Sequence, residues 1–520
     1  MPASAAALLT FDFDLALFRR PCKKGGIQVS NKYANSSSPL VRAKPKMATD
    51  IPASITTPDA VETRLGTLRF FDGLPDEATV QTLYDNLDFQ RGVQAFLAAL
   101  PAADLYAFRA GIRTFGPVNQ TVLISESLLD SRTRFYGSGN TETIYTIGWL
   151  DTKDGPLVIE MPPHVLGMIN DCWGRYVADL GRVGPDRGAG GKYLLIPPGY
   201  TGAVPNGYFV LTSCTYGNAF FLRGFLADGD PRPAVENTKQ HLRVYPLDRA
   251  ADMPTMTFAD ISGADFSTVP ASDASLFEHV ATIVQEEPLD TIDPETRGLL
   301  AAIGIRKDKP FAPDERMQRI LADAAAVGTA TARALLFSPR DRAVFYYPNS
   351  AWKMSWPDND CQFSPGGILD LDSRAGYFFF AWGVSPAVSV KMVGAGSQYA
   401  FTEHDAAGHY LDGGKTYRLH LPPNIPMKDF WSVVVYDTQT RSMLQTDQRF
   451  PSLSSQKKDL FVNPDSSVDV YFGPEPPVGK ESNWIQTIPG KGWCTYLRLY
   501  GPLEPWFDQT WRPGEIERVD

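Results

Sequence analysis

The sequence predicts a mainly β, α+β protein with two antiparallel jelly-roll or β-sandwich-like domains, an N-terminal helical region and a helical linker. Three observations lead to this expectation. The 520 residues include 42 prolines and 43 glycines and are 12% aromatic, a composition that favours short strands joined by turns. Short β-rich runs bounded by Gly, Pro and Asp fill two separate regions. Ahead of these regions and between them, apolar residues follow a helical period.

The first 46 residues differ in character from the rest of the chain. They contain eight basic and two acidic residues, whereas the whole chain has a net charge of −10. The apolar run at residues 5–9 is short, and Asp12 and Asp14 follow closely, which argues against a secretory signal. The resemblance to an organelle transit peptide is weak. We therefore expect residues 1–46 to be a disordered tail or an extension ahead of a start at Met47, and the protein to be cytoplasmic.

Residues 57–250 are expected to form a first domain with a helical part and a β part. The pattern from Thr57 to Phe115 is helical: Asp76 and Glu77 open a stretch with helical spacing, and a second such stretch ends at Pro101. From Val122 onward the pattern changes to short strands separated by turns. The expected strands cover residues 122–124, 143–150, 157–160, 192–196, 208–215, 219–223 and 241–245.

Residues 251–345 form a helix-rich linker in this interpretation. Apolar residues recur at helical spacing within 275–286 and 313–336, so the segment is expected to buttress or bridge two β domains. The β pattern then returns and defines a second β domain over 346–520. Its expected strands cover residues 376–382, 388–393, 416–421, 431–437, 468–472 and 494–500. No short internal repeat occurs, which excludes a solenoid or propeller.

Composition excludes several classes of function. The chain has 49 Lys and Arg against 59 Asp and Glu, which argues against a nucleic-acid groove over the whole surface. Its five cysteines are scattered without a CxxC pair, so neither a disulfide scaffold nor a thiolate zinc site is expected. No apolar run reaches the ~18 residues of a membrane span. We expect a small-molecule ligand and no nucleic-acid or membrane partner, with homo-oligomer formation left open.

Two sets of motifs resemble known domains of unknown function. The stretches at 130–132, 139–145, 149–151, 155–160, 171–175, 184–188 and 191–200 look like DUF1254. The stretches at 430–437, 440–442, 471–474, 483–484, 492–493 and 498–502 are similar to DUF1214. The likeness covers roughly residues 58–511 and implies two jelly-roll-like domains in tandem, but it supplies no reaction. One departure is Glu142, where the family more often has Asp, and the longer side chain would move any carboxylate that works there.

A first group of candidate binding residues lies at the start of an expected strand. Asn140, Thr143 and Tyr145, with Arg134 just before them, place an amide, a hydroxyl and a phenol near one another. They are candidates for binding a polar ligand. The alternative is a buried hydrogen-bond network that ties a loop to a sheet edge.

A second group combines two charges with an aromatic ring. At strand spacing, Asp171, Trp173 and Arg175 share a face, with Arg187 and Lys192 farther along. Such a group suits an anionic or sugar-like ligand, because a guanidinium binds carboxylate or phosphate in a bidentate manner. We expect catalytic roles for Asp171 and Arg175. The alternative is an internal ion pair between Asp171 and Arg175 that fixes the conformation of the loop.

A third group lies in the second β domain. Lys428 and Tyr436 are candidate acid–base residues if burial lowers the lysine pKa, and Arg441 is a candidate ligand residue. Trp484 and Trp493 lie in Gly/Pro-rich loops, where exposed rings stack on sugars or flat ligands. The alternatives are a hairpin turn after Tyr436 and a core position for the tryptophans.

Metal and cofactor chemistry finds little support in the sequence. His404, His409 and His420 suggest a cupin-like site, but the first two bracket a turn instead of alternating on a strand. We expect no metal and no nucleotide cofactor. The favoured function is an enzyme that acts on a small polar or aromatic metabolite by metal-independent acid–base chemistry, namely hydrolysis, dehydration or isomerisation. Its site is expected in a cleft between the β domains. The alternatives are a non-catalytic carbohydrate- or partner-binding module and a His-ligated metal enzyme.

Overall fold

The computed structural model describes residues 49–133 and 137–519, so the expected tail at 1–46 and the candidate Arg134 lie outside the described residues. The chain divides into two compact units, residues 1–75 and residues 76–520. The described part of the first unit is an antiparallel sheet, not the helix expected from residue 57. The sheet consists of β1 (Ala60–Thr63), β2 (Gly66–Phe71) and β3 (Leu74–Pro75). The Asp72-Gly73 pair causes this difference, since both residues have positive φ, as a two-residue hairpin requires.

The second unit begins with the long helix α1 (Glu77–Arg113). The Asp76 carboxylate caps it by accepting a hydrogen bond from the Thr79 amide at 2.8 Å. The expectation that Pro101 ends the helix is wrong, because Pro101 lies inside it. Residues on both sides of the proline are buried against α3, α5 and α6, and this packing outweighs the missing backbone hydrogen bond.

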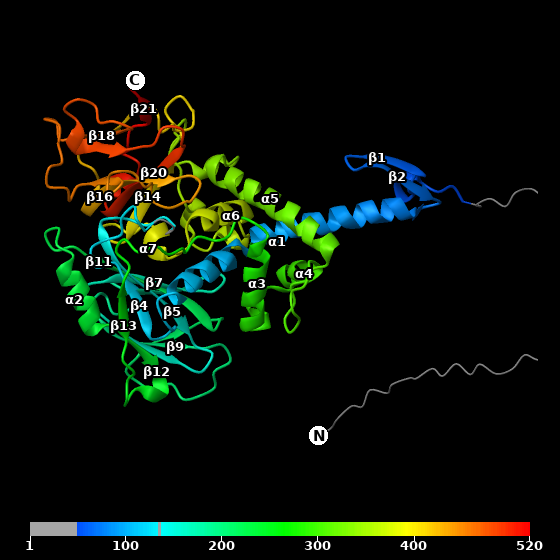
Figure 1. The fold of residues 1–520 in the computed structure, drawn as a ribbon, viewed down its shortest axis with the longest axis horizontal. Coiled ribbons are helices and arrows are strands. Elements are labelled where there is room, and N and C mark those ends of the chain that lie inside the picture. Colours follow the sequence, from blue (N-terminus) through cyan, green and yellow to red (C-terminus); the bar gives the residue numbers. More distant parts are fainter. Residues whose placement is uncertain (1–48, 134–136, 520) are drawn as a thin grey trace, which may run out of the picture. The chain divides into compact units, whose positions relative to one another are not determined.

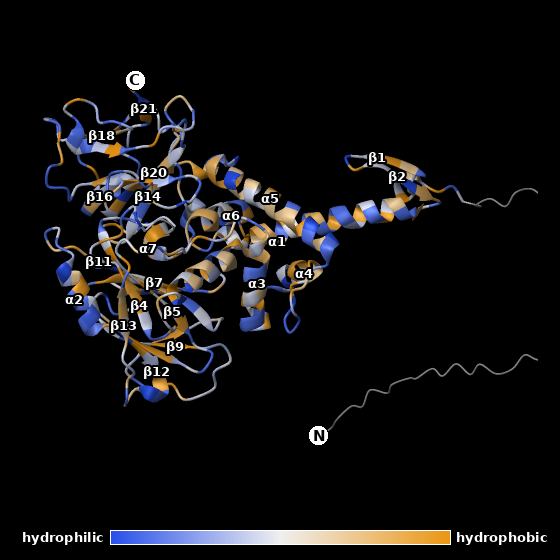
Figure 2. Ribbon diagram, in the orientation of Figure 1, coloured by the Kyte–Doolittle hydropathy of each residue, from blue (hydrophilic) through white to orange (hydrophobic). Residues whose placement is uncertain are grey.

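The first β domain is a sandwich of two sheets. A six-stranded sheet in the order β13-β4-β5-β11-β7-β8 faces a four-stranded sheet in the order β10-β9-β6-β12. The strands are β4 (Thr121–Ile124), β5 (Thr143–Asp151), β6 (Leu157–Met161), β7 (Leu166–Asp171), β8 (Tyr176–Gly181), β9 (Gly191–Ile196), β10 (Phe209–Thr212), β11 (Gly217–Phe225), β12 (Arg243–Pro246) and β13 (Thr257–Asp260). Pairing is antiparallel except for β9–β10 and β4–β13. Side chains such as Ile159, Leu195, Phe220 and Leu222 fill the space between the sheets, and the strands near β9 and β12 are largely orange in Figure 2.

In the sequence, helices lie on both sides of the last two strands of this domain, β12 and β13. Residue 241 ends α2 (Arg232–His241) instead of starting a strand. The linker contains α3 (Ser275–Glu286), α4 (Pro294–Ala302) and α5 (Glu315–Phe337), and its first strand, β13, joins the sheet of the first domain. Short 3-10 turns are η1 (Ala53–Ile55), η2 (Leu247–Arg249), η3 (Leu289–Thr291), η4 (Arg342–Val344), η5 (Pro357–Asn359), η6 (Pro365–Gly367) and η7 (Glu481–Asn483).

The second β domain is also a sandwich of two sheets, in the orders β14-β20-β16-β17 and β19-β18-β15-β21. Its strands are β14 (Ser397–Thr402), β15 (Tyr417–Leu421), β16 (Met427–Asp437), β17 (Ser452–Ser454), β18 (Val468–Gly473), β19 (Trp484–Gln486), β20 (Trp493–Pro502) and β21 (Ile516–Arg518). A short helix, α8 (Glu504–Phe507), follows β20. In Figure 1 this domain, orange to red, lies above the first sandwich, cyan to green. The chain is thus mainly β with an α+β arrangement, as the sequence predicts.

Two strands expected at the start of the second domain are helices. Residues 376–382 belong largely to α6 (Leu371–Phe380), and residues 388–393 begin within α7 (Pro386–Ser389). Asp370 caps α6 by accepting a hydrogen bond from the Ser373 amide at 3.0 Å. The aromatic run of α6, which has a strand-like composition, is buried in a core that helices share with both sandwiches.

This shared core depends on the two-residue alternation of β-strands. In β11, Phe220 and Leu222 fill the first sandwich, whereas Phe221 packs in the shared core. In β20, Leu497 and Leu499 fill the second sandwich, whereas Tyr496 packs in the shared core. The outer faces of the two sandwiches therefore meet over α1, α3, α5 and α6, and the residues between them define the junction of the two domains.

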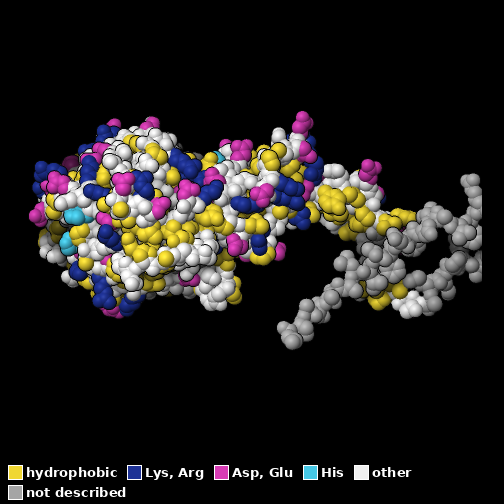
Figure 3. Space-filling model, turned by 90° about the horizontal axis from the view of Figure 1, so that it is seen from below, with side chains coloured by type: hydrophobic (Ala, Val, Ile, Leu, Met, Phe, Trp, Pro, Cys, Tyr) yellow, Lys and Arg dark blue, Asp and Glu magenta, His cyan; other side chains and the backbone are white. Residues whose placement is uncertain are grey.

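Two helices, α1 and α5, are long and apolar enough to cross a membrane by length and composition alone. In α1, 72% of the apolar 18-residue stretch is buried inside the protein, whereas in α5 the buried share is 28%. Packing in the shared core thus largely accounts for the apolar character of α1. On the face shown in Figure 3, Lys and Arg side chains alternate with Asp and Glu, without a continuous basic patch.

Close packing of α5 on α1 gives a stability prediction. A Cβ added at Gly328 would lie 2.6 Å from the ring of the buried Phe96, whereas one added at Gly298 in α4 would meet no atom within 4 Å. We expect Gly328→Ala to lower the free energy of unfolding by about 1–2 kcal/mol through overpacking. The same substitution at Gly298 should raise it by about 0.5–1 kcal/mol. Urea denaturation of both variants measures the difference, and equal effects at the two sites would contradict the observed helix packing.

Candidate functional site

A cavity of about 90 Å³ lies at the junction of the two β domains. Strands β5, β7 and β11 of the first domain and β14 and β20 of the second contribute to its wall, together with residues 355–388. The side chains that matter for its chemistry are Tyr145, Met168, Phe221, Arg223, Ser355, Trp356, Tyr377, Trp382, Ser385, Tyr399, Tyr496 and Arg498. The cavity is thus an apolar, aromatic chamber with two cationic groups.

Two arginines reach the cavity, one from each β domain. Arg223 on β11 lies directly across from Tyr145 on β5, and Arg498 on β20 lies directly across from Tyr399 on β14. Both arginines stand on the outer faces of their sandwiches and are only 5% and 4% exposed. Burying a charge is costly unless it is paired, so the partners of these groups are informative.

The hydrogen-bond partners of both guanidinium groups are hydroxyls and a carbonyl, not carboxylates. Arg223 Nη1 donates to Ser397 Oγ at 3.1 Å, and Arg498 Nη2 donates to the Ser138 carbonyl at 2.7 Å and to the Tyr436 hydroxyl at 2.5 Å. Within residues 49–133 and 137–519, neither arginine forms an ion pair with a carboxylate, and the Nε atom of each has no hydrogen-bond partner. Aromatic rings supply the remaining contacts, with Tyr500 at 5.3 Å from Arg223 and Tyr399 at 5.2 Å from Arg498.

Glu142 is a carboxylate that acts on Arg498 electrostatically, but it is already engaged by other groups. Its carboxylate interacts with the hydroxyls of Thr141, Ser452 and Ser432. Burial raises the pKa of Glu142, and these hydroxyls and Arg498 only partly oppose the shift. Among the described residues, the positive charges at the cavity therefore have no carboxylate in direct contact.

Tyr399 differs from the other phenols that line the cavity. Burial acts to raise its pKa, but the charges of Arg223 and Arg498 and hydrogen bonds with Arg223 and Ser397 outweigh burial and hold the pKa of Tyr399 below its ordinary value of 10.0. Burial instead raises the pKa of Tyr145, Tyr377 and Tyr496. A buried phenol with a lowered pKa is suited to proton transfer.

The first group of sequence candidates lies beside this cavity. Tyr145 lines it, and the Tyr145 hydroxyl accepts a hydrogen bond from the Asn140 amide at 3.1 Å. The Asn140 side chain accepts from Thr143 Oγ1 at 3.0 Å and donates to the Tyr500 hydroxyl, in the other domain, at 2.9 Å. Asn140 and Thr143 thus form the buried network that was the alternative interpretation, and this network positions Tyr145.

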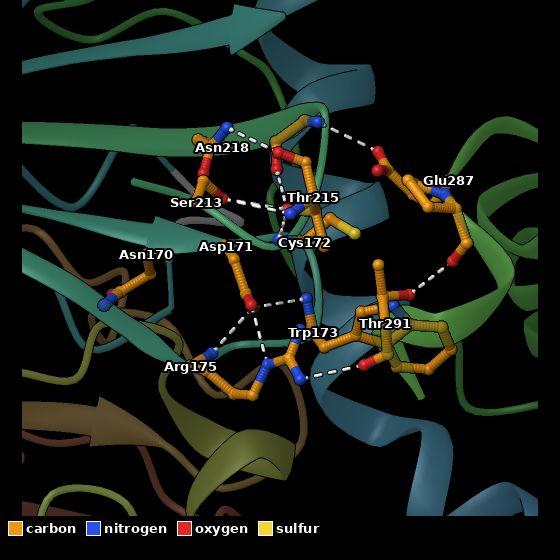
Figure 4. Close-up of polar contacts among 12 residues, drawn as sticks. Asn170, Asp171, Cys172, Trp173, Arg175, Ser213, Thr215, Asn218, Glu287 and Thr291 are labelled. Atoms are coloured by element: carbon orange, nitrogen blue, oxygen red, sulfur yellow. Dashed lines mark hydrogen bonds and ion pairs between the residues drawn. The ribbon is translucent and has the colours of Figure 1, made fainter. Parts of the chain in front are cut away.

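The side chains of Asp171 and Arg175 bind each other and nearby backbone groups (Figure 4). Asp171 ends β7, and residues 172–175 form a turn with Gly174 at a φ of 70°, so the expectation that these side chains share a strand face is wrong. The Asp171 carboxylate accepts from Arg175 Nε at 2.6 Å and from the amides of Trp173 and Arg175 at 2.9 and 3.0 Å. Arg175 Nη1 donates to the Thr291 carbonyl at 2.8 Å. Burial raises the pKa of Asp171, against the effect of Arg175.

The remaining charged candidates do not line the cavity. Arg187 is exposed at a turn, and Lys192 forms an ion pair with Glu160 at 2.8 Å. Lys428 is exposed at the start of β16, whereas Tyr436 is buried near its other end, so the proposed lysine–tyrosine pair does not meet. Tyr436 nevertheless contacts the site, because its hydroxyl accepts from Arg498 and donates to the Gly139 carbonyl at 2.5 Å.

Arg441 and the two tryptophans have structural partners, and the tryptophans begin strands β19 and β20 instead of lying in loops. Arg441 is buried and donates to the carbonyls of Phe379 and Pro270 at 2.8 and 3.0 Å. Trp493 lies in the core of the second sandwich, and the half-buried Trp484 donates its indole N–H to the Gly473 carbonyl at 2.9 Å. These contacts match the core alternative for Trp493.

The three histidines pair with separate carboxylates. His404 lies 2.8 Å from Glu403, His409 3.6 Å from Asp405 and His420 2.8 Å from Asp469. In the part of the chain that the structure describes, no cluster of three or more His, Cys, Asp or Glu side chains is arranged to hold a metal ion.

The two arginines were missed among the sequence candidates, although a signal for them exists. Both interrupt strands that are otherwise apolar, in the sequences Phe221-Leu222-Arg223-Gly224 and Leu497-Arg498-Leu499-Tyr500. A charge inside such a strand must find a partner or a ligand at a buried position. What the sequence does not show is that these two strands face the same cavity.

The carboxyl of Asp179, next to the cavity wall, gives a pH-dependent prediction. It accepts a hydrogen bond from Ser385, which lines the cavity, and burial raises the pKa of Asp179 to about 6. The neighbouring Tyr176 and Cys361 have a pKa raised to about 12 and about 11, so neither titrates in the same range.

Because the ordinary value for Asp is 3.8, the folded state favours the protonated carboxyl, and stability falls as the pH rises from about 4 through about 6. We expect Asp179→Asn to raise the free energy of unfolding by about 1–3 kcal/mol above pH 6 and to have little effect near pH 4. Thermal unfolding across this range measures the effect, with the exposed Asp323→Asn as control. A gain that is equal at both pH values would contradict the raised pKa.

Comparisons with known proteins agree with the two-domain architecture. The model of the family described as "Protein of unknown function (DUF1254)" matches residues 118–246, and that of "Protein of unknown function (DUF1214)" matches residues 396–504. No curated protein matches.

Two crystal structures are similar to this chain. The VPA0106 protein from Vibrio parahaemolyticus is 17% identical, with a TM-score of 0.52, and the match covers 83% of this chain and all of that one. A putative uncharacterized protein from Burkholderia cenocepacia is 14% identical, with a TM-score of 0.41, over 85% of this chain and 97% of that one. The first likeness supports the fold alone. The chain thus contains a region that matches DUF1254 followed by a region that matches DUF1214, which is the tandem arrangement that the sequence motifs predict.

Proposed function

We propose that this protein is an enzyme that binds a small organic anion in the cavity between its two β domains and acts on it by acid–base chemistry. Arg223 and Arg498 bind the anion, and Tyr399 transfers the proton. The observation that carries the proposal is the pair of buried arginines that line one cavity without a carboxylate partner among the described residues.

The charges favour an anionic ligand. Two buried guanidinium groups with neutral partners are expensive to maintain, and a bound carboxylate would offset much of that cost. The rings of Trp356, Trp382 and Phe221 would contact the rest of such a ligand. This supports a substrate that combines an acidic group with an apolar or aromatic body.

The position of Tyr399 favours proton transfer. It lines the same cavity and interacts with both arginines, which stabilise its phenolate. In the simplest cycle the phenolate takes a proton from a substrate carbon next to the acidic group and returns it to the same or a neighbouring atom. Isomerisation and dehydration both begin with such a step. An arginine-bound carboxylate would also stabilise the negative charge that develops on the substrate.

The carbohydrate-platform alternative has less support from the geometry. It needs exposed rings, whereas Trp493 is a core residue and Trp484 is half-buried with its indole N–H already donated. A non-catalytic binding role for the cavity is an outcome of the following test.

The test separates binding from proton transfer. For wild-type protein, isothermal titration calorimetry should show binding of small carboxylates such as benzoate and hexanoate, with much weaker binding of the matched carboxamides. Arg223→Gln should weaken carboxylate binding ~10–100-fold, because it removes a charge-assisted contact. The control Arg187→Gln, at an exposed arginine of the same domain, should bind as wild type does.

Proton transfer is measured by NMR as exchange of the α C–H of hexanoate for deuterium in D₂O, since the corresponding carbon of benzoate carries no hydrogen. We expect Tyr399→Phe to keep carboxylate affinity within ~3-fold and to lose the exchange. Carboxylate binding without exchange in wild type would indicate a binding module, and unchanged affinity in Arg223→Gln would refute the anion site.

A further inference from the structure

A second cavity, of about 340 Å³, adjoins the first. Ser355, Tyr377 and Tyr496 line both cavities and form the wall between them. In this wall Ser355 Oγ and the Tyr496 hydroxyl are 3.4 Å apart, and the Tyr377 hydroxyl donates to the Gly383 carbonyl. Ser355 is the smallest of the three side chains, so it leaves the most room for a passage between the cavities.

Much of the second cavity is apolar. The side chains that give it this character are Leu335, Leu336, Val344, Met354, Leu369, Leu371, Phe380 and Phe401. They come from the end of α5, from α6 and from the segment between these helices, apart from Phe401 on β14. The cavity is larger than the first one and suits the apolar part of a ligand.

The charged groups around the second cavity already have partners. Lys353 Nζ donates to both oxygens of Glu403, at 2.5 and 2.6 Å, and to the Leu336 carbonyl at 3.0 Å. Arg340 pairs with Asp372 at 2.9 Å, and the Asp341 and Asp370 carboxylates cap η4 and α6. In the first cavity, by contrast, Arg223 and Arg498 have no carboxylate partner among the described residues. The charge available for a ligand is therefore confined to the first cavity.

From this asymmetry we infer that the ligand is an amphiphilic monocarboxylate, with an alkyl or aryl-alkyl chain. Its carboxylate binds Arg223 and Arg498, its middle contacts the aromatic wall of the first cavity, and its tail passes Ser355 into the second cavity. This inference rests on the proposed anion site and adds the length and polarity of the substrate. A second acidic group on the tail is disfavoured, because the cations of the second cavity are already paired.

The experiment measures affinity along a series of unbranched carboxylates from acetate to octanoate, by calorimetry on the full chain. Each added CH₂ that enters the second cavity should tighten binding ~4-fold, the ratio expected for burial of a methylene group. The matched primary alcohols, which lack the charge, should bind much more weakly at each length.

Two variants locate the tail. Ser355→Phe, which fills the wall that both cavities share, should abolish the additional affinity that octanoate has over butyrate. Val344 lines the second cavity but not the first, so Val344→Phe should leave butyrate affinity within ~3-fold and abolish the same additional affinity of octanoate. This second variant guards against a folding defect in the first. Circular dichroism and thermal unfolding verify that both variants are folded.

The outcomes separate the two proposals. If affinity does not change with chain length while Arg223→Gln weakens every carboxylate, the anion site stands and the amphiphile inference is refuted. If chain length matters but Ser355→Phe and Val344→Phe leave the gain intact, the tail does not enter the second cavity and the inference is also refuted. If Arg223→Gln changes no affinity, the proposed function itself fails.

Discussion

Two positive charges are buried where the outer faces of the two sandwiches meet, and the local structure is organised around them. Arg223 and Arg498 are held by hydroxyls, a carbonyl and aromatic rings, and no carboxylate of the described residues neutralises them by direct contact. Neutral acceptors keep the guanidinium groups oriented without cancelling their field. The field therefore acts on whatever else enters the cavity, including the phenol of Tyr399.

Keeping the two arginines on one cavity requires a fixed relation between the domains. Hydrogen bonds across the junction supply it: Asn140 to Tyr500 at 2.9 Å, and Tyr436 to the Gly139 carbonyl at 2.5 Å. An ion pair between Arg449 and Asp130 at 2.8 Å adds a charged contact. The shared hydrophobic core, to which both sandwiches and α1 contribute, surrounds these polar contacts. The site is thus set by tertiary packing, not by a local sequence motif.

This explains which features could be predicted from the sequence. Strands such as β5, β16 and β18 have a clear apolar pattern between turn residues, and their positions were predicted to within a few residues. The aromatic run 376–382 was assigned to a strand because its composition is strand-like, but the Asp370 cap and burial among helices make it α6. Proline lacks a backbone N–H, so the sequence predicts that the helix ends at Pro101. In the structure, burial of the residues on both sides of Pro101 keeps the helix continuous.

The candidate site was predictable only in part, for the same reason. The sequence places Asp171 close to Arg175, and in the structure the two side chains form an ion pair, which was the alternative interpretation. Tyr145 was identified because it lies in a recognisable motif, whereas Arg223 and Arg498 lie far apart in the chain. Only the arrangement of β11 and β20 around the cavity shows that the two belong together.

The division of the proposed anion site between two domains has a consequence for how this architecture can vary. An isolated DUF1254 or DUF1214 segment would carry half of the site and would expose to water a sheet face that is built for burial, with an arginine in its middle. Recombination that pairs one segment with an unrelated partner would thus lose both the ligand and a large part of the folding energy at once.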